Sequence, residues 1–193
     1  MRVLVLFAHP VETSYNAALH AATVAALKAS GHEVDDCDLY AEGFNPVMSR
    51  QERLDYHDEA ICTAPVQGYV DRVRAAEALV ICTPVWNYGY PAILKGFFDR
   101  VFLPGVSFKL VDGKVAPNLR HIRRIAAVTT YGGSRFRTIL MGDPPRRFFK
   151  RALRALIAPL AKAKYLALYD MNRNDEATLK AFLGRVEKEM RAF

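Results

Sequence analysis

The chain has 193 residues, of which 51% are hydrophobic and 24% charged, a size that supports one substantial core and is short for two domains. Its 27 lysines and arginines outnumber its 20 aspartates and glutamates, so the formal net charge is +7, which does not by itself choose among anionic partners. No apolar run approaches membrane-spanning length, and three scattered cysteines without a CxxC pair indicate neither a disulfide framework nor a zinc site. We therefore expect one globular domain over residues 1–193, with no metal, no membrane insertion and a cytoplasmic location.

Five short apolar runs rich in β-branched residues predict strands, and a segment of helix length separates each run from the next. The predicted strands cover residues 2–8, 32–39, 78–83, 124–130 and 164–170. The predicted helices cover residues 14–30, 65–76, 91–102, 144–162 and 175–191. Residues 40–64 are the longest irregular piece, for which we expect a crossing connection or an interface element with one short helix at 50–59.

Regular alternation of strands and helices predicts an α/β fold, a parallel sheet covered by helices on both faces. Five strands suit the flavodoxin-like three-layer sandwich with strand order 2-1-3-4-5, in which ligands bind at the carboxyl ends of strands one and three. The unusual loops of this sequence follow strands one, three and four, which are neighbours in that order. The fold therefore predicts that these three loops build one site.

The first loop is HPVETSYN, residues 9–16, at the start of a predicted helix. It lacks both the GxGxxG of a Rossmann site and the GK[ST] of a P-loop. The hydroxyls of Thr13 and Ser14, the amide of Asn16 and the free N–H groups of a helix start favour a bound phosphate. An ordinary N-cap at Thr13 or Ser14 is the alternative.

The second loop, PVWNYGYP at residues 84–91, carries large rings where a plain connector would carry small polar residues. Trp86 and Tyr88 could stack on a flat conjugated ligand, and Asn87 offers a donor and an acceptor to the edge of a heterocycle. The alternative is that the rings fill the core beside the following helix. We favour the ligand because pockets form at this point of the fold.

The third loop has adjacent glycines, Gly132 and Gly133, which let the backbone approach a ligand and leave N–H groups free to donate. A plain turn is the alternative. Taken together, the three loops predict a planar, ring-bearing ligand with an anionic group. That is the shape of a flavin nucleotide.

Four segments then carry a family resemblance: HPVETSYN, DLYAEGFNPVMSR, PAILKGFFDRVF and TTYGG resemble the NAD(P)H quinone reductase family, flavodoxin-fold flavoproteins that are usually dimers. The resemblance assigns the flavin phosphates to His9, Thr13, Ser14, Tyr15 and Asn16. It assigns the isoalloxazine ring to Pro84, Val85, Trp86, Asn87 and Tyr88. It assigns the other edge of the ring to Thr130, Gly132 and Gly133.

The resemblance implies a homodimer that passes two electrons as hydride from NAD(P)H to a quinone or similar electrophile, in ping-pong order. The resemblance makes FAD the expected flavin. FMN is the alternative, because the chain is shorter than the longer quinone reductases between Arg50 and Pro65 and lacks their C-terminal extension, which argues against a site for the adenine half of FAD. Thr138 and Pro144 stand where those enzymes carry a tyrosine and a histidine. We therefore assign no catalytic acid or base.

Other functions stay open. An FMN-dependent azoreductase or nitroreductase has the same fold, and a regulatory subunit of a potassium-efflux system could use the basic residues after Pro145 as its partner face. A one-electron carrier flavodoxin usually has an acidic docking surface, which the net charge of +7 disfavours. The basic clusters at 120–124 and 145–154 match no nucleic-acid-binding pattern, so we interpret them as solvated helix faces and expect no nucleic-acid partner.

Overall fold

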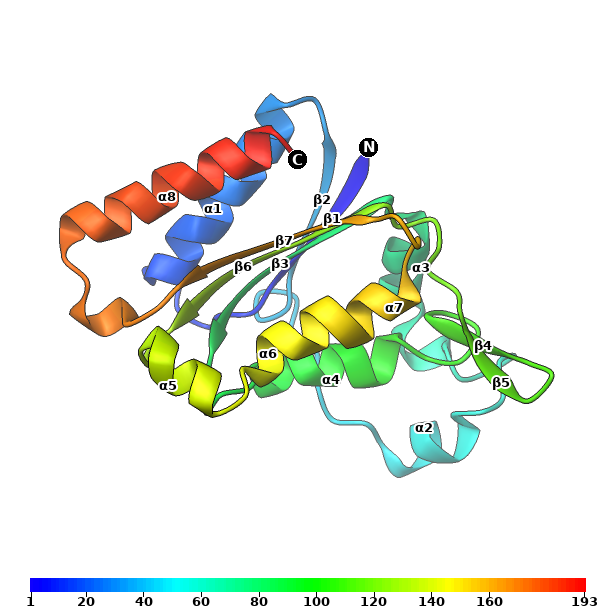
Figure 1. Cartoon of the computed structure of the whole chain (residues 1–193). Helices are drawn as coiled ribbons and strands as arrows, with labels where there is room; N and C mark the ends of the chain where they lie inside the picture. Colours follow the sequence, from blue (N-terminus) through cyan, green and yellow to red (C-terminus); the bar gives the residue numbers. More distant parts are fainter.

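The computed structural model describes residues 1–193 and contains a five-stranded, all-parallel sheet (Figure 1). Its strands are β1 (Arg2–Phe7), β2 (Glu33–Asp38), β3 (Ala78–Val85), β6 (Arg124–Tyr131) and β7 (Lys162–Leu168). The strand order is β2-β1-β3-β6-β7, so the predicted flavodoxin-like order 2-1-3-4-5 is confirmed. The carboxyl ends of β1, β3 and β6 therefore lie side by side.

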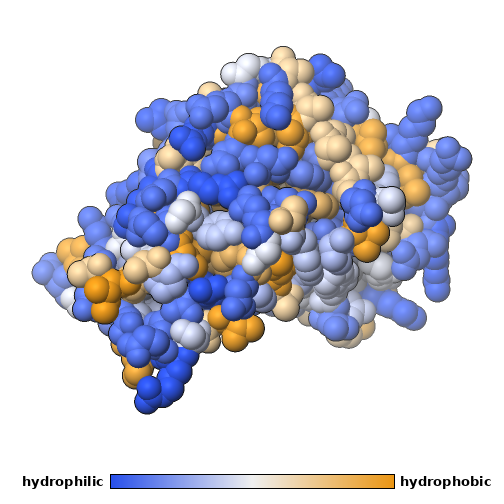
Figure 2. Space-filling view, turned by 180° about the vertical axis from the view of Figure 1, so that it is seen from behind, coloured by the Kyte–Doolittle hydropathy of each residue, from blue (hydrophilic) through white to orange (hydrophobic).

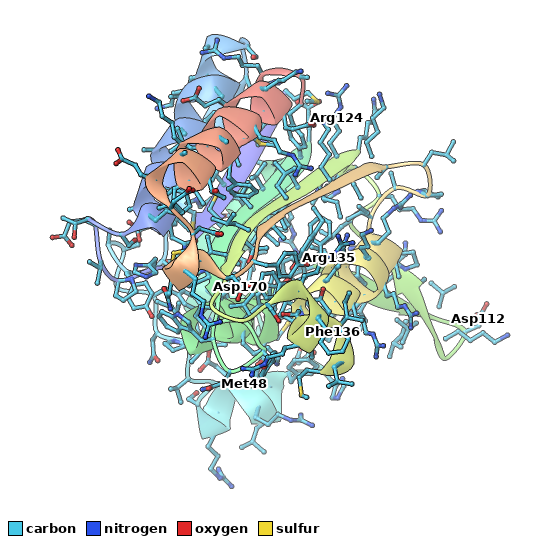
Figure 3. All side chains as sticks on the ribbon, turned by 60° about the vertical axis from the view of Figure 1, so that its left-hand side comes forward. Met48, Asp112, Arg124, Arg135, Phe136 and Asp170 are labelled. Atoms are coloured by element: carbon cyan, nitrogen blue, oxygen red, sulfur yellow. The ribbon has the colours of Figure 1, made fainter.

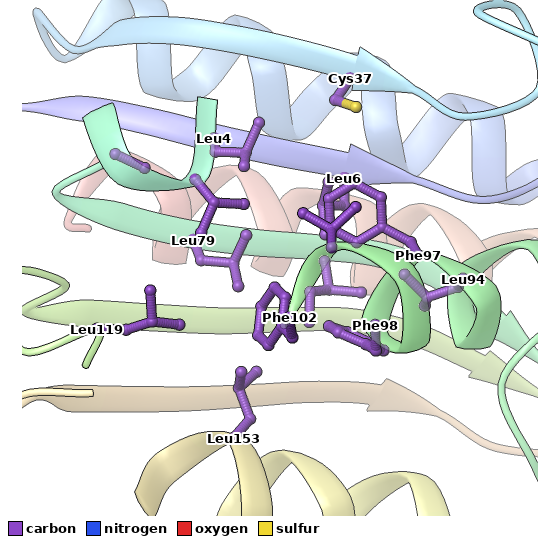
Figure 4. Packing of buried hydrophobic residues seen from close by; sticks show 14 of the residues in the cluster. Leu4, Leu6, Cys37, Leu79, Leu94, Phe97, Phe98, Phe102, Leu119 and Leu153 are labelled. Carbon is purple, nitrogen blue, oxygen red and sulfur yellow. The ribbon is translucent and has the colours of Figure 1, made fainter. Parts of the chain in front are cut away.

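Helices cover both faces of the sheet, and alternate residues of each strand supply the two cores. Along β1, Val3 and Val5 pack under α1 (Tyr15–Ala29) and α8 (Glu176–Arg191). Leu4 and Leu6 point to the opposite face, which α3 (Gln67–Ala75) and α4 (Ala92–Val101) cover. Figure 4 shows Leu4 and Leu6 on the same face of the sheet as Phe97 and Phe98 of α4. This two-sided burial explains why the central strands β1, β3 and β6 are nearly continuous apolar runs.

Local signals explain where α1 and α8 begin and end. Ser14 caps α1 by accepting a hydrogen bond from the N–H of Ala17 at 3.1 Å, and Asp175 caps α8 by accepting from Thr178 at 2.8 Å. Gly31 follows α1 in the left-handed conformation with φ of +76°. Glycine adopts that conformation without steric cost and so ends the helix there.

The connection between β2 and α3 contains α2 (Arg50–Asp55) and a 3₁₀ turn, η1 (Ala64–Val66). Ser49 and Glu52 form a reciprocal capping box at the start of α2. The connection packs on α4, where a methyl group added at Gly96 would lie 2.4 Å from Pro46. The guanidinium of Arg100, 8% exposed, donates to the Glu52 carboxylate and to the carbonyl of Asn45. The two sequence segments that carry the most specific resemblance, DLYAEGFNPV and PAILKGFFDRVF, are therefore pressed against each other.

One predicted helix is wrong in its extent. Residues 144–162 form α6 (Pro144–Arg147), a π-helical segment η2 (Phe148–Leu153) and a last turn α7 (Arg154–Leu156), after which the chain is extended at Ile157. Leu119 pairs with Ile157, and the guanidinium of Arg154 binds the carbonyl groups of Ala158 and Pro159. These contacts end the helix early, and β7 already begins at Lys162.

Three elements were not predicted: the hairpin of β4 (Phe108–Val111) and β5 (Lys114–Pro117), the helix α5 (Arg135–Leu140) and the 3₁₀ turn η3 (Met171–Arg173). The hairpin turn has Asp112 and Gly113 at positive φ. The Asp-Gly pair between two apolar runs was a readable hairpin signal. None of the helices is both long enough and apolar enough to span a bilayer.

Candidate functional site

The three unusual loops meet at the carboxyl edge of the sheet, at the ends of β1, β3 and β6. The ring of His9, after β1, lies edge-on to that of Trp86, after β3, with 5.9 Å between ring centroids. The amide of Asn16 donates to the hydroxyl of Thr130, near the end of β6, at 2.7 Å. Residues more than a hundred positions apart in sequence thus form one contiguous surface.

The loop after β1 organises itself and leaves donors free. Its backbone is folded by a hydrogen bond from the N–H of Val11 to the Nδ1 atom of His9 at 3.1 Å. The hydroxyl oxygen of Ser14 accepts the hydrogen bond that caps α1, whereas the side chain of Thr13 is exposed. The backbone N–H groups of Tyr15 and Asn16 have no acceptor within the protein. A helix start with free N–H groups and a nearby hydroxyl can hold an anion.

The side chains of Tyr15 and Asn16 point into the protein. The hydroxyl of Tyr15 donates to the carbonyl of Leu179 in α8 at 2.7 Å, and burial raises the pKa of Tyr15 to about 12. Asn16 is 3% exposed, donates to Thr130, and has a buried amide oxygen without a partner. The backbone N–H groups of these two residues can therefore donate to a ligand, while their side chains hold α1 in place.

The loop after β3 is a tight turn in an uncommon conformation. Trp86 and Gly89 exchange two backbone hydrogen bonds of 3.0 and 2.8 Å around Asn87 and Tyr88. Both central residues are left-handed, with φ of +49° and +57°. This conformation suits glycine or asparagine and strains a tyrosine, and such strain concentrates at functional sites.

The turn holds its rings away from the core. Trp86 is 41% exposed and Tyr88 is 38% exposed, so neither fills the interior. Tyr90 does fill it, because its ring packs on Phe98 and Phe148 and its hydroxyl donates to the carbonyl of Pro145 at 2.9 Å. The N–H groups of Asn87 and Tyr88 have no acceptor in the protein and can donate to a ligand.

The double glycine after β6 separates two cavities. A cavity of about 230 Å³ is lined by Val85, Asn87, Tyr88, Tyr131, Gly132, Gly133 and Thr138. On the other side of the glycines lies a cavity of about 160 Å³, with Arg137 and Arg173 in its wall. Neither glycine has a positive φ. A methyl group at Gly133 would lie 3.9 Å from the hydroxyl of Tyr88, an ordinary contact distance, so packing within the protein does not by itself require glycine here.

Comparison with known proteins adds to this geometry. A family model described as "Flavodoxin-like fold" matches residues 1–188. The chain belongs to the flavodoxin-like family.

Three relatives of this flavodoxin-like protein define its similarities. NAD(P)H dehydrogenase [quinone] 1 of Rattus norvegicus is 32% identical over 149 residues, which are 69% of this chain and 54% of the relative. The FMN-dependent NADH:quinone oxidoreductase of Coprothermobacter proteolyticus is 30% identical over 108 residues, which are 52% of this chain and 51% of the relative. The crystal structure of Smu.1420 from Streptococcus mutans superposes with a TM-score of 0.84, 27% identity and complete coverage of both chains.

These similarities confirm the resemblance to the NAD(P)H quinone reductases that the sequence motifs indicated. The chain spans about half the length of the curated relatives it matches. The site must therefore be judged on the donors that this chain itself presents.

The donor set of this flavodoxin-like protein fits a flavin nucleotide. An anionic phosphate needs the free N–H groups and hydroxyl at the start of α1. A planar ring needs an exposed aromatic surface, and Trp86 and Tyr88 provide it beside the cavity at Gly132. The ring edge needs hydrogen-bond donors, and the N–H groups of Asn87 and Tyr88 are free.

Tyr131 is a residue of the site that the sequence analysis missed. It lines the 230 Å³ cavity, is 1% exposed, and donates its hydroxyl hydrogen to the Asp143 carboxylate at 2.8 Å. Burial, the neighbouring Tyr165 hydroxyl and the Asp143 carboxylate raise the pKa of Tyr131 far above its usual range. The sequence signal that could have identified Tyr131 was its position directly before the double glycine. Only the tertiary structure shows that its hydroxyl is hydrogen-bonded to Asp143.

Proposed function

We propose that this protein is a flavin-dependent NAD(P)H oxidoreductase that passes two electrons as hydride to quinones or similar electrophiles. The observation that carries the proposal is the strained turn at Asn87 and Tyr88, which holds two exposed rings beside the double glycine and opposite the start of α1. The similarity to NAD(P)H and NADH quinone oxidoreductases supports it. We also propose that residues 1–193 act as one flavin-binding domain in the cytoplasm.

Each loop has a separate task in this proposal. Thr13, Ser14 and the N–H groups of Tyr15 and Asn16 bind the flavin phosphate, and His9 packs on Trp86 to fix the adjoining wall. The ring is held by Pro84, Val85, Trp86, Asn87, Tyr88, Thr130, Gly132 and Gly133. When bound, the flavin supplies the hydride chemistry. The protein contributes position. Binding each substrate in turn against one surface removes much of the entropic cost of bringing the reactants together, and so it raises the rate.

No side chain of this site is assigned as a catalytic acid. Tyr131 keeps its proton because its pKa is raised by burial and its hydroxyl is bonded to Asp143. A proton for the reduced quinone therefore comes from solvent or from the substrate complex. We expect the rate of quinone reduction to vary little across the pH range where a histidine would titrate, near its reference pKa of about 6.5.

FMN is the flavin we favour, with FAD as the alternative. The name of the Coprothermobacter relative supports FMN. The adenosine half of FAD would need space beyond the phosphate loop, where a cavity of about 490 Å³ is available. Its wall includes the carboxylates of Glu12 and Asp38, which repel a second phosphate. The mass of the flavin released by heat from the purified protein distinguishes the two cofactors.

A homodimer is proposed on the basis of exposed apolar surface. In the connection 40–64, Val47 is 68% and Leu54 60% exposed, and on α5 Phe136 is 77% exposed. Figure 2 shows apolar groups at the surface at the lower left, over the β4–β5 hairpin and α2, and Figure 3 shows Phe136 on α5. Large exposed apolar groups on a monomer mark an interaction surface, and a two-fold pairing would cover them.

The proposed function is tested by loading the protein with FMN and measuring turnover of NADH and NADPH with quinones, azo dyes and nitroaromatics side by side. We expect quinones to be the best acceptors. Trp86→Ala should weaken flavin binding by about 5-fold, whereas Trp86→Phe should retain most of it, since stacking is worth about 1 kcal/mol. Absence of flavin binding would refute the proposal. Preference for azo dyes would favour the azoreductase alternative, and slow turnover with every acceptor would favour a regulatory subunit.

A further inference from the structure

A further cavity of about 310 Å³ lies on the far side of α5 and is strongly basic. Arg146, Arg147, Lys150 and Arg151 line it, and Asp143 is its single carboxylate. None of these four cations forms an ion pair with a carboxylate. Such a concentration of unpaired charge around a concave surface raises the local concentration of anions.

The local backbone gathers these charges. Gly142 and Asp143 are both left-handed, with φ of +82° and +45°, and they turn the chain from α5 into α6. The guanidinium of Arg147 folds back over Gly142, where an added methyl group would lie 3.2 Å from its Nη1 atom. Arg147 ends α6, Lys150 and Arg151 lie in the π-helical segment η2, and all three side chains line the cavity.

Two charged groups of the cavity are already engaged. The guanidinium of Arg146 lies over the ring of Tyr165, 5.2 Å from its centroid, and bonds the hydroxyl of Tyr169. The Asp143 carboxylate accepts hydrogen bonds from the Tyr131 hydroxyl and the N–H of Arg146. Arg147, Lys150 and Arg151 remain exposed and free to bind a ligand.

The basic cavity adjoins the site described above. Helix α5 separates the two, with Thr138 lining the cavity at the double glycine and Ile139 lining the basic cavity. The hydrogen bond between Tyr131 and Asp143 joins their walls. A ligand that occupies both must be elongated, with a reactive group at one end and a strong anion at the other.

We propose that the basic cavity binds the 2′-phosphate of NADPH and thereby selects NADPH over NADH. This inference rests on the proposed function, in which NAD(P)H meets the flavin that is held beside the double glycine. A phosphomonoester carries close to two negative charges at neutral pH and matches the forked donors of arginine. NADH has a neutral hydroxyl at the same position and gains nothing from the cations.

The test compares Lys150→Gln/Arg151→Gln with a control of equal charge loss, Lys109→Gln/Lys114→Gln, on the β4–β5 hairpin. All four side chains are exposed, so folding is preserved. In the FMN-loaded protein we expect the ratio of kcat/KM for NADPH to that for NADH to fall about 10- to 100-fold in the first variant, the effect of losing charge-assisted hydrogen bonds. The control should keep the wild-type ratio.

A binding measurement gives a readout besides turnover. By calorimetry, the wild-type protein should bind 2′,5′-ADP at least about 10-fold more tightly than 5′-AMP, with the preference weakening as salt is added. The Lys150→Gln/Arg151→Gln variant should lose the preference. Equal affinity of the wild-type protein for the two nucleotides, or a preference that survives in the variant, would overturn the inference. If flavin binding and NADH oxidation hold while that preference is absent, this inference alone fails, whereas failure to bind flavin refutes the proposed function.

Discussion

Gly96→Ala should destabilise the protein although alanine is the better helix former. The added methyl group would lie 2.4 Å from both the Cβ atom and the carbonyl oxygen of Pro46, about 1 Å inside normal contact distance. Overpacking of this kind costs about 3 kcal/mol, at the upper end of its range because the obstacle is backbone, and the gain in helix propensity is about 1 kcal/mol. The expected net loss is about 2 kcal/mol, which lowers Tm by about 4 to 8 °C for a chain of this size.

Urea unfolding followed by circular dichroism measures this loss, and Gly184→Ala in α8 is the matched control. Nothing lies within 4 Å of a methyl group at Gly184, so that variant should gain about 0.5 to 1 kcal/mol. Displacement of Pro46 should also disturb the contact of Arg100 with the Asn45 carbonyl. If Gly96→Ala were as stable as the wild-type protein or more stable, the reasoning about the contact of α4 with this connection would be refuted.

Further predictions concern pH, strain and assembly. Burial by itself raises the pKa of Glu52, but hydrogen bonds from Ser49 and Arg100 outweigh it and lower the pKa below its usual value. The stability that the Glu52–Arg100 pair contributes is therefore present above the pKa of the unfolded state and is lost as the pH falls through the pKa of the folded state. Glu52→Gln should therefore be less stable than wild type at pH 7 in urea unfolding and lose less on acidification; equal losses would contradict this. Tyr88→Gly should weaken flavin binding in a fluorescence titration without lowering the unfolding free energy, because glycine relieves the left-handed strain; a fall in stability would show that the strain is not relieved. Light scattering should give twice the monomer mass of 21.7 kDa, and a 21.7 kDa species at micromolar concentration would refute the dimer.

The sequence by itself determined the sheet and the edge at which the three unusual loops meet. Apolar runs, helix-length spacers and caps such as Ser14 are local signals, and their alternation left few topologies that a parallel sheet can adopt. The observed strand order then brought His9, Trp86 and Thr130 to one edge, as the loops after strands one, three and four predicted. Chain order and local periodicity were sufficient because neighbouring parallel strands present their loops at the same edge.

Tertiary structure alone decided how individual side chains are used. Tyr15 and Tyr88 both lie in segments that were predicted to bind the flavin, yet the hydroxyl of Tyr15 is bonded to α8 and Tyr88 is held outward by a left-handed turn. The early end of the helix that begins at Pro144 depends on the pairing of Ile157 with Leu119, a contact between distant parts of the chain. Contacts of this kind join residues far apart in sequence, so local patterns could not show which rings are buried or that the cations after Pro145 surround a cavity.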